Sequence, residues 1–153
     1  MRNLSKGINY CLKNLIILSI IIAVFPACNI NKEKKIDRHI KKGREYLNSS
    51  KYREAVIEFK NVIQIDPKNV QGHYNLGISY LRLGGFSNLQ LAFQQFNRAI
   101  ELDVNLMDAH LKVGELYLLA REFDKAKEKA ELILKKEANN QDARILIATA
   151  FAG

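Results

Sequence analysis

A four-residue pattern that occurs three times decides the fold expected of this chain: GREY at residues 43–46, GISY at 77–80 and GELY at 114–117. The first two copies lie 34 residues apart and the last two 37 residues apart. Three alanines show the same two intervals in the opposite order, at Ala55, Ala92 and Ala126. The chain therefore contains an internal repeat of 34 residues, with three extra residues between Tyr80 and Ala92.

Two further sets of residues stand at helical spacing from these alanines. Those three positions earlier are Tyr52, Leu89 and Phe123, and those four positions later are Phe59, Phe96 and Ala130. Spacings of three and four place side chains on one face of a helix. Each unit is therefore expected to be a helix, a short turn and a second helix. The predicted helices cover residues 37–47, 52–65, 71–83, 89–102, 107–119 and 123–137, and another begins at 141.

Turn residues separate these helices. Asp66-Pro67 closes the first unit, because the residue before a proline disfavours helical geometry. Gly84, Gly85 and Ser87 fall in the three-residue insertion, where they predict a loop.

The repeat resembles the tetratricopeptide-repeat family. The shared features are the 34-residue period, the small residue at the eighth place (Gly43, Gly77, Gly114), the tyrosine at the eleventh and the alanine at the twentieth. The resemblance implies an all-α, right-handed solenoid of about three and a half repeats, because each helix pair buries its apolar face only by stacking on its neighbours. The expected units are residues 36–69, 70–106, 107–140 and the first helix of an incomplete fourth, 141–153. Departures from the family pattern are His39, His73, His110, Val104, Ala130 and Ala138.

The same resemblance implies that the first helix of each unit lines a concave groove that binds a protein or peptide partner. The candidate groove residues are Arg44, Asn48, Tyr74, Asn75, Ile78, Arg82, Leu111, Lys112 and Glu115. Cochaperone repeats that grip a C-terminal carboxylate are matched only at Asn75 and Lys112. Ile40 and Asp108 stand where that clamp needs lysines, so this activity is not expected.

Catalysis and metal binding are not expected. His39, His73 and His110 hold the same place in successive units, so the repeat separates them by about 10 Å, the distance between packed helices. A zinc ligand nitrogen lies within about 2.1 Å of its metal. No glycine-rich phosphate loop or Gly-x-Ser-x-Gly turn occurs in the sequence. We therefore predict a non-catalytic chain with no cofactor and no metal.

The N-terminal stretch resembles a bacterial lipoprotein signal peptide over residues 1–27. Arg2, Lys6 and Lys13 precede an apolar run, Leu15–Phe25, that ends at Pro26, Ala27 and Cys28. The run is shorter than the roughly 20 apolar residues of a membrane span. A lipid anchor at Cys28 is the expected outcome, and an uncleaved anchor with Cys28 as a free thiol is the alternative.

Positive charge is concentrated near the N-terminus. The formal net charge of +8 falls to +5 without the signal peptide, and the stretch Lys32–Arg44, with seven basic and two acidic residues, accounts for that +5. The remainder is neutral, which argues against nucleic acid as a partner. Residues 28–35 are expected to be a basic tether, either solvated or touching anionic lipid.

Two functions fit these features. The first is an interaction scaffold of the bacterial cell envelope, on the periplasmic or outer side with the outer membrane favoured, serving exopolysaccharide export with exosortase sorting, pilus assembly or outer-membrane assembly. The second is an envelope carrier of a lipid or glycan, which needs an enclosed pocket. The segment Ala143–Phe151 is apolar on most sides, so we expect further repeats, another protein or self-association to cover it.

Overall fold

The structure, a computed structural model, describes residues 31–153, and all the regular elements in this part of the chain are helices. A first helix covers residues 31–48. It is followed by α2 (Tyr52–Ile65), α3 (Val70–Leu83), α4 (Phe86–Leu102), α5 (Met107–Leu119), α6 (Phe123–Lys136) and α7 (Gln141–Ala152). Residues up to Arg38 form a separate unit from the compact unit His39–Gly153. The predicted all-α fold is confirmed.

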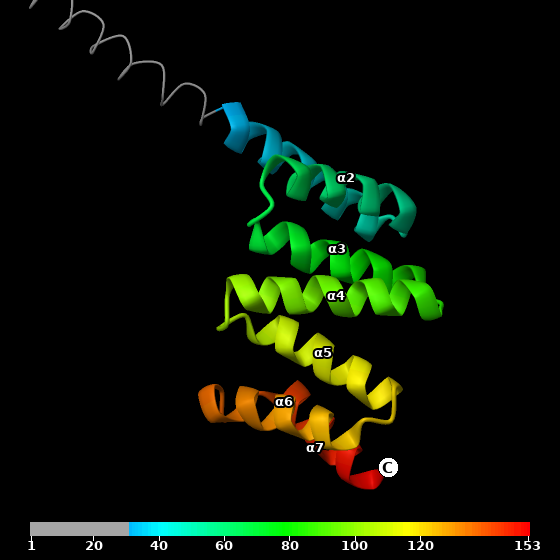
Figure 1. The fold of residues 1–153 in the computed structure, drawn as a ribbon, viewed down its shortest axis with the longest axis vertical. Helices are drawn as coiled ribbons and strands as arrows, with labels where there is room; N and C mark the ends of the chain where they lie inside the picture. The colour runs from blue at the N-terminus through cyan, green and yellow to red at the C-terminus, as the bar shows by residue number, and fades with distance from the viewer. Residues whose placement is uncertain (1–30) are drawn as a thin grey trace, which may run out of the picture. The chain divides into compact units, whose positions relative to one another are not determined.

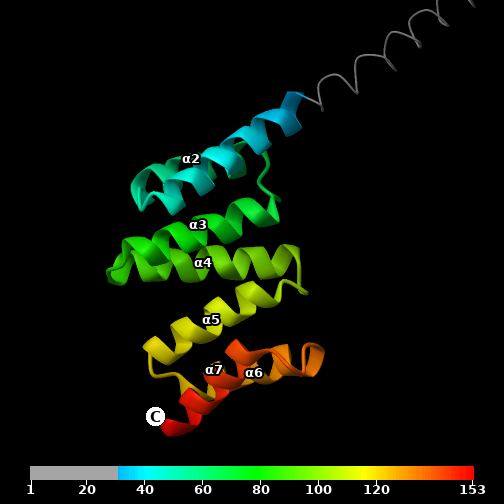
Figure 2. The same ribbon diagram turned by 180° about the vertical axis from the view of Figure 1, so that it is seen from behind.

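Within the unit His39–Gly153 the chain runs back and forth, and each helix stacks on the one before it (Figure 1). The opposite view in Figure 2 shows the same order from α2 to α7. One contact skips a helix: α7 packs on α5 as well as on α6. The first helices of the third and fourth units therefore lie next to each other, as a groove between them requires.

The turn inside each unit reverses the chain at an equivalent residue with positive φ. These residues are Ser50 (φ 57°), Gly84 (φ 67°) and Arg121 (φ 60°), and they hold equivalent places in the repeat. In the first and third units the next amide donates to the tyrosine carbonyl of the repeat, from Lys51 N to Tyr46 O and from Glu122 N to Tyr117 O, both 2.8 Å. This bond is the C-terminal helix cap of a Schellman motif.

The three inserted residues of the second unit do not form the loop predicted from Gly84, Gly85 and Ser87. Only the two glycines make the turn, and Gly85 also has positive φ (81°). Ser87 lies inside α4, which begins at Phe86 and has 17 residues, against 14 in α2 and α6. Three residues add almost one helical turn, so the insertion lengthens α4 and leaves its buried face in register.

Two apolar clusters form the core of the compact unit. The first spans α2 to α5 and is centred on Phe59, Leu76 and Phe96. The second joins α5, α6 and α7 and includes Ala130, Ile133 and Leu146. Both clusters lie between stacked helices, which is where a repeat solenoid buries its apolar surface.

The small residues of the repeat permit close helix contact. A Cβ added at Gly43 would lie 2.6 Å from the Phe59 ring, and one at Gly77 would lie 2.7 Å from the Phe96 ring. At Gly114 the corresponding contact is Leu146 of α7, at 2.5 Å. Any side chain larger than hydrogen at these positions would push the helices apart.

Residues expected to be a tether are partly helical, since residues 31–35 belong to the first helix. The predicted signal peptide and the predicted lipid attachment at Cys28 lie outside the described residues. No helix of the described part of the chain is both long and apolar enough to cross a membrane.

Candidate peptide-binding groove

The first helices of the third and fourth units form a small pocket between them. Its volume is about 140 Å³, and its walls are mostly aliphatic. It is lined by Leu111, Glu115, Leu118, Asp142, Ile145, Leu146 and Thr149. A pocket on this surface lies where the resemblance placed the partner groove.

Tyr74 of α3 extends this surface toward the second unit. Its ring packs against Phe96, with ring centroids 5.7 Å apart. Burial raises the pKa of the Tyr74 phenol, and the negative charges of Asp108 and Glu115 raise it further. Because both carboxylates belong to α5, this effect shows that α3 and α5 share one electrostatic environment.

Lys112 and Glu115 form an ion pair along α5. The Lys112 ammonium donates to both carboxylate oxygens of Glu115, at 2.7 and 2.9 Å. Their side chains are 26% and 42% exposed, so a partner in the groove could reach both groups.

The nine predicted groove residues differ in exposure. Arg44, Asn48 and Arg82 are exposed, whereas Tyr74, Ile78, Lys112 and Glu115 are partly buried. Asn75 and Leu111 are buried, each 8% exposed. The Asn75 amide donates to the Gln71 carbonyl one turn earlier at 2.8 Å, so its side chain is engaged within its own helix. Partner contact by these nine residues stays a prediction.

Sequence reasoning did not include α7 in the groove. Asp142, Ile145 and Thr149 line the pocket and hold the second, fifth and ninth places of the fourth unit. These are places that line the groove in the earlier units. Continuing the repeat register past residue 140 would have found them.

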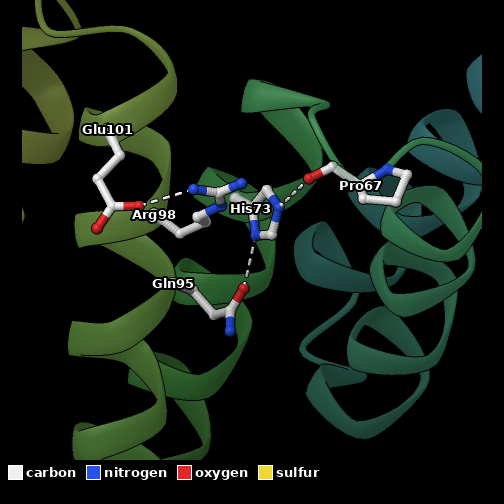
Figure 3. Close-up of polar contacts among 5 residues, drawn as sticks. All are labelled: Pro67, His73, Gln95, Arg98 and Glu101. Carbon is white, nitrogen blue, oxygen red and sulfur yellow. Dashed lines mark hydrogen bonds and ion pairs between the residues drawn. The ribbon is translucent and has the colours of Figure 1, made fainter.

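Two of the three histidines join helices of the same unit. His73 donates from Nε2 to the Pro67 carbonyl at 3.0 Å, and its Nδ1 lies 2.8 Å from Oε1 of Gln95 (Figure 3). His39 contacts Glu58 in the same way, with Nδ1 and Oε2 2.6 Å apart. These two histidines thus have a structural role between two helices. Within residues 31–153 no group of three or more potential metal ligands is arranged to hold an ion.

His110 departs from this pattern. Its Nε2 donates to the Val104 carbonyl at 3.1 Å, but its Nδ1 is buried with no hydrogen-bond partner among the described residues. The residue equivalent to Glu58 and Gln95 is Lys129, whose side chain forms no hydrogen bond with this nitrogen. Burial lowers the pKa of His110, and the charges of Lys129 and Lys136 lower it further, against an opposing hydrogen bond to Val104.

A second cleft, of about 480 Å³, lies beside the lengthened start of α4. It is lined by Phe86, Leu89, Gln90, Phe93, Gln94, Leu116, Tyr117, Leu119, Ala120 and Glu122. Phe86 is 77% exposed and Leu119 is 64% exposed, so the cleft is open to solvent. It involves none of the predicted groove residues.

Comparison with known proteins agrees with a helical-repeat scaffold. A family model described as "TPR repeat" matches residues 43–84. The chain is 28% identical over 109 residues to the Hsp70-Hsp90 organizing protein of Triticum aestivum, a match that covers 71% of this chain and 18% of that protein. It is 24% identical over 137 residues to the peptidyl-prolyl cis-trans isomerase FKBP4 of Homo sapiens, covering 78% of this chain and 29% of that protein. The chain thus spans less than a third of the length of these relatives.

Solved structures show the same fold. The first TPR of Spaghetti (RPAP3), bound to the HSP90 peptide SRMEEVD, matches with a TM-score of 0.72 and 24% identity, over 78% of this chain and 92% of that chain. The MamA protein matches with a TM-score of 0.70 and 25% identity, over 76% and 62%. These matches and the helix order establish an all-α tetratricopeptide-repeat solenoid. The family-model match and the structural neighbours support the tetratricopeptide-repeat family for this chain.

Proposed function

We propose that the chain is a non-catalytic interaction scaffold whose first-helix groove binds a segment of a partner protein. The observation that carries the proposal is the pocket between α5 and α7, which joins apolar walls to a few polar groups on that surface. Peptide-binding grooves combine these two features, because apolar contact supplies affinity and polar groups supply orientation.

The neighbours support peptide binding as the mode of recognition. One solved relative holds the HSP90 peptide SRMEEVD, and another, the TPR2B domain of yeast Sti1, is a complex with Hsp70. In this chain Asp108 of α5 forms no ion pair with a described residue, so the middle of the groove carries an unbalanced negative charge. An acidic peptide would be repelled there, so the proposed partner is a different one.

Substitution on matched surfaces tests the groove. The full chain, affinity-tagged and crosslinked in native membranes, would be compared with an Arg44→Ala, Arg82→Ala variant, which removes two exposed charges from first helices. The control is Arg53→Ala, Lys135→Ala, which removes two exposed charges from second helices. Like Arg82 in α3, Lys135 stands in the last turn of its helix. We expect the groove variant alone to lose partner recovery, and equal recovery by both variants would refute the groove.

The proposal includes anchorage in the bacterial cell envelope through a lipid on Cys28. Its support is the order of a basic segment, an apolar run and Ala27-Cys28 in the sequence. The expected place is the outer membrane, within an export or assembly system such as exopolysaccharide export with exosortase sorting. Mass spectrometry of the mature N-terminus should find diacylglycerol on Cys28. An intact Met1 end, or a Cys28→Ser variant that still fractionates with membranes, would refute this anchor.

Self-association through α7 is a further part of the proposal. Ile145 is 63% exposed and Phe151 is 69% exposed, and burying such side chains contributes about 1.5 to 3 kcal/mol each. Light scattering on the full chain in neutral detergent should show a larger mass than an Ile145→Lys, Phe151→Lys variant. Equal masses for the two proteins would refute self-association through α7.

The carrier alternative is less well supported. A carried lipid or glycan needs an enclosed pocket. The larger cleft, beside α4, is open at Phe86 and Leu119. We therefore favour the scaffold.

A further inference from the structure

The pocket between α5 and α7 combines two kinds of wall. Four aliphatic side chains form one part: Leu111, Leu118, Ile145 and Leu146. Two carboxylates, Glu115 of α5 and Asp142 of α7, stand among them, and Thr149 adds a hydroxyl. The volume of about 140 Å³ suits a single side chain rather than a larger ligand.

The charge at this pocket is only partly balanced. Glu115 is paired with Lys112, whereas Asp142 takes part in no ion pair with any described residue. Asp108, which begins the same face of α5, is likewise without an ion-pair partner in the described part of the chain. The negative charges of Asp108 and Glu115 extend far enough to raise the pKa of Tyr74 on α3. The pocket thus presents apolar contact together with one carboxylate, that of Asp142, that no ion pair balances among the described residues.

Basic side chains stand elsewhere in the groove. Arg44 and Arg82 are exposed on the first helices of the first and second units, and neither forms an ion pair with a described residue. The groove of the unit His39–Gly153 is therefore basic on its earlier repeats and acidic at the α5–α7 pocket. A partner segment that lies along it is expected to have complementary charge.

From this we infer that the α5–α7 pocket accepts a lysine or arginine side chain of the partner segment. The inference rests on the proposed function, because it names the chemistry of the bound segment. A lysine or arginine has an aliphatic stem, which would pack on Leu118 and Ile145, and a cationic end, which would reach Asp142 and Glu115. A leucine would leave the Asp142 carboxylate without an ion pair, and a glutamate would be repelled by it.

Asp142 also has a structural reason to be acidic. It is the second residue of α7, and an acidic side chain in the first turn is stabilised by the helix dipole. Asp124 holds the same second place in α6 and is exposed as well, but it does not line the pocket. Substituting Asp124 therefore carries the same helix-dipole cost and serves as the matched control.

Three peptide probes test the inference. They are amidated decapeptides of one alanine, serine and leucine background that differ only in a central Lys, Glu or Leu. Each would be titrated into the full chain, isotope-labelled and solubilised in a neutral detergent, with amide shifts of Leu118, Ile145 and Thr149 as the readout. We expect the Lys probe to bind about tenfold more tightly than the Glu probe, which corresponds to about 1.4 kcal/mol. The preference should shrink in 1 M salt, where the screening length is about 3 Å.

Three variants decide the outcome. Asp142→Lys should abolish the preference for the Lys probe, and Asp142→Asn, which keeps the shape of the side chain, should reduce it. Asp124→Lys should leave it unchanged, and helicity by circular dichroism checks the fold of each variant. Equal binding of the Lys and Glu probes, no binding of the Lys probe, or equal effects of Asp142→Lys and Asp124→Lys would each overturn the inference. The groove itself would then still be judged by the Arg44→Ala, Arg82→Ala comparison, whose residues do not line the pocket, so the two failures are distinguishable.

Discussion

The first two repeats and the third solve the same packing problem with different residues. In the first two units a phenylalanine of the second helix, Phe59 or Phe96, is fully buried against the glycine of the first helix. In the third unit the equivalent residue is Ala130, and the glycine contacts Leu146 of α7 instead. The third repeat therefore takes part of its core from the repeat that follows it.

The polar contacts that the histidines make between the two helices of a unit differ in the same way. The side chains of His39 and His73 each contact a side chain on the second helix, Glu58 or Gln95. In the third unit the equivalent residue is Lys129, and Nδ1 of His110 has no hydrogen-bond partner among the described residues. A buried polar atom without a partner costs about 1–3 kcal/mol. By itself, the third unit is therefore expected to be less stable than the first two. Its packing against α7 compensates for this difference. The same helix supplies part of the candidate groove.

Removing Leu146 should give the largest effect on this comparison. We expect Leu146→Ala to lower the free energy of unfolding by about 3 kcal/mol, because it is 3% exposed and would leave a cavity at Gly114. Ile145→Ala on the same helix, where the side chain is 63% exposed, should cost less than about 0.5 kcal/mol. Urea unfolding followed by circular dichroism measures both. Similar costs for the two variants would show that α7 does not complete the third repeat.

Restoring the phenylalanine tests whether Leu146 occupies its place. Ala130→Phe alone should destabilise by about 1–3 kcal/mol, because the new ring would meet a filled core. Combined with Leu146→Ala it should cost less than the sum of the two changes, with a coupling energy of at least about 1 kcal/mol. Additive costs in this double-mutant cycle would mean that the two side chains occupy separate spaces.

The buried Nδ1 of His110, which has no hydrogen-bond partner among the described residues, predicts that stability depends on pH. Its folded pKa is lowered below 6.5, so between the two values the unfolded chain binds a proton that the folded chain does not. Stability should therefore fall as the pH drops from 6.5 toward the folded pKa, by at most about 1.4 kcal/mol per pH unit from this group. Lys129→Gln supplies the amide found at Gln95 and removes a positive charge, so unfolding curves across this range should show a shallower slope. An unchanged slope would exclude His110 as the source.

The smallest expected effects on stability concern the turns inside the units. Arg121 has positive φ without being a glycine, whereas Gly84 holds the equivalent place in the second unit. Gly84→Ala should destabilise by about 1 kcal/mol through the left-handed backbone. Arg121→Gly should stabilise by about 0.5 kcal/mol, since relief of strain exceeds the added freedom of the unfolded chain. Thermal unfolding of both variants checks the signs, and a loss of stability in Arg121→Gly would show that its side chain contributes contacts.

The fold could be predicted from the sequence because each repeat carries its own local signals. Helix ends at Tyr52, Ile65, Leu83 and Leu102 follow from the spacing of apolar residues, and the structure has the same ends. The predicted start of α4 at residue 89 is wrong, because Ser87 is a residue type typical of turns but lies inside the helix. The glycines alone satisfy the turn, and a three-residue insertion preserves the helix face.

The candidate site was less accessible to sequence reasoning. The contact between Gly114 and Leu146 joins residues on two different helices, and no local spacing indicates it. Asn75 holds a groove place in the repeat register, but its amide bonds to the Gln71 carbonyl, an alternative that the residue type does not distinguish. Asp142 and Ile145 follow from the register once a fourth unit is accepted.

The most direct test of the central claim places a photo-crosslinking amino acid at two matched isoleucines of the full chain in its native cells. Ile145 lines the α5–α7 pocket and is 63% exposed, and Ile57 lies on α2, a second helix, and is 59% exposed. If the first helices form the partner-binding groove, irradiation should crosslink a partner protein from position 145 and not from position 57. Adducts from position 57 alone, or equal adducts from both, would contradict the account.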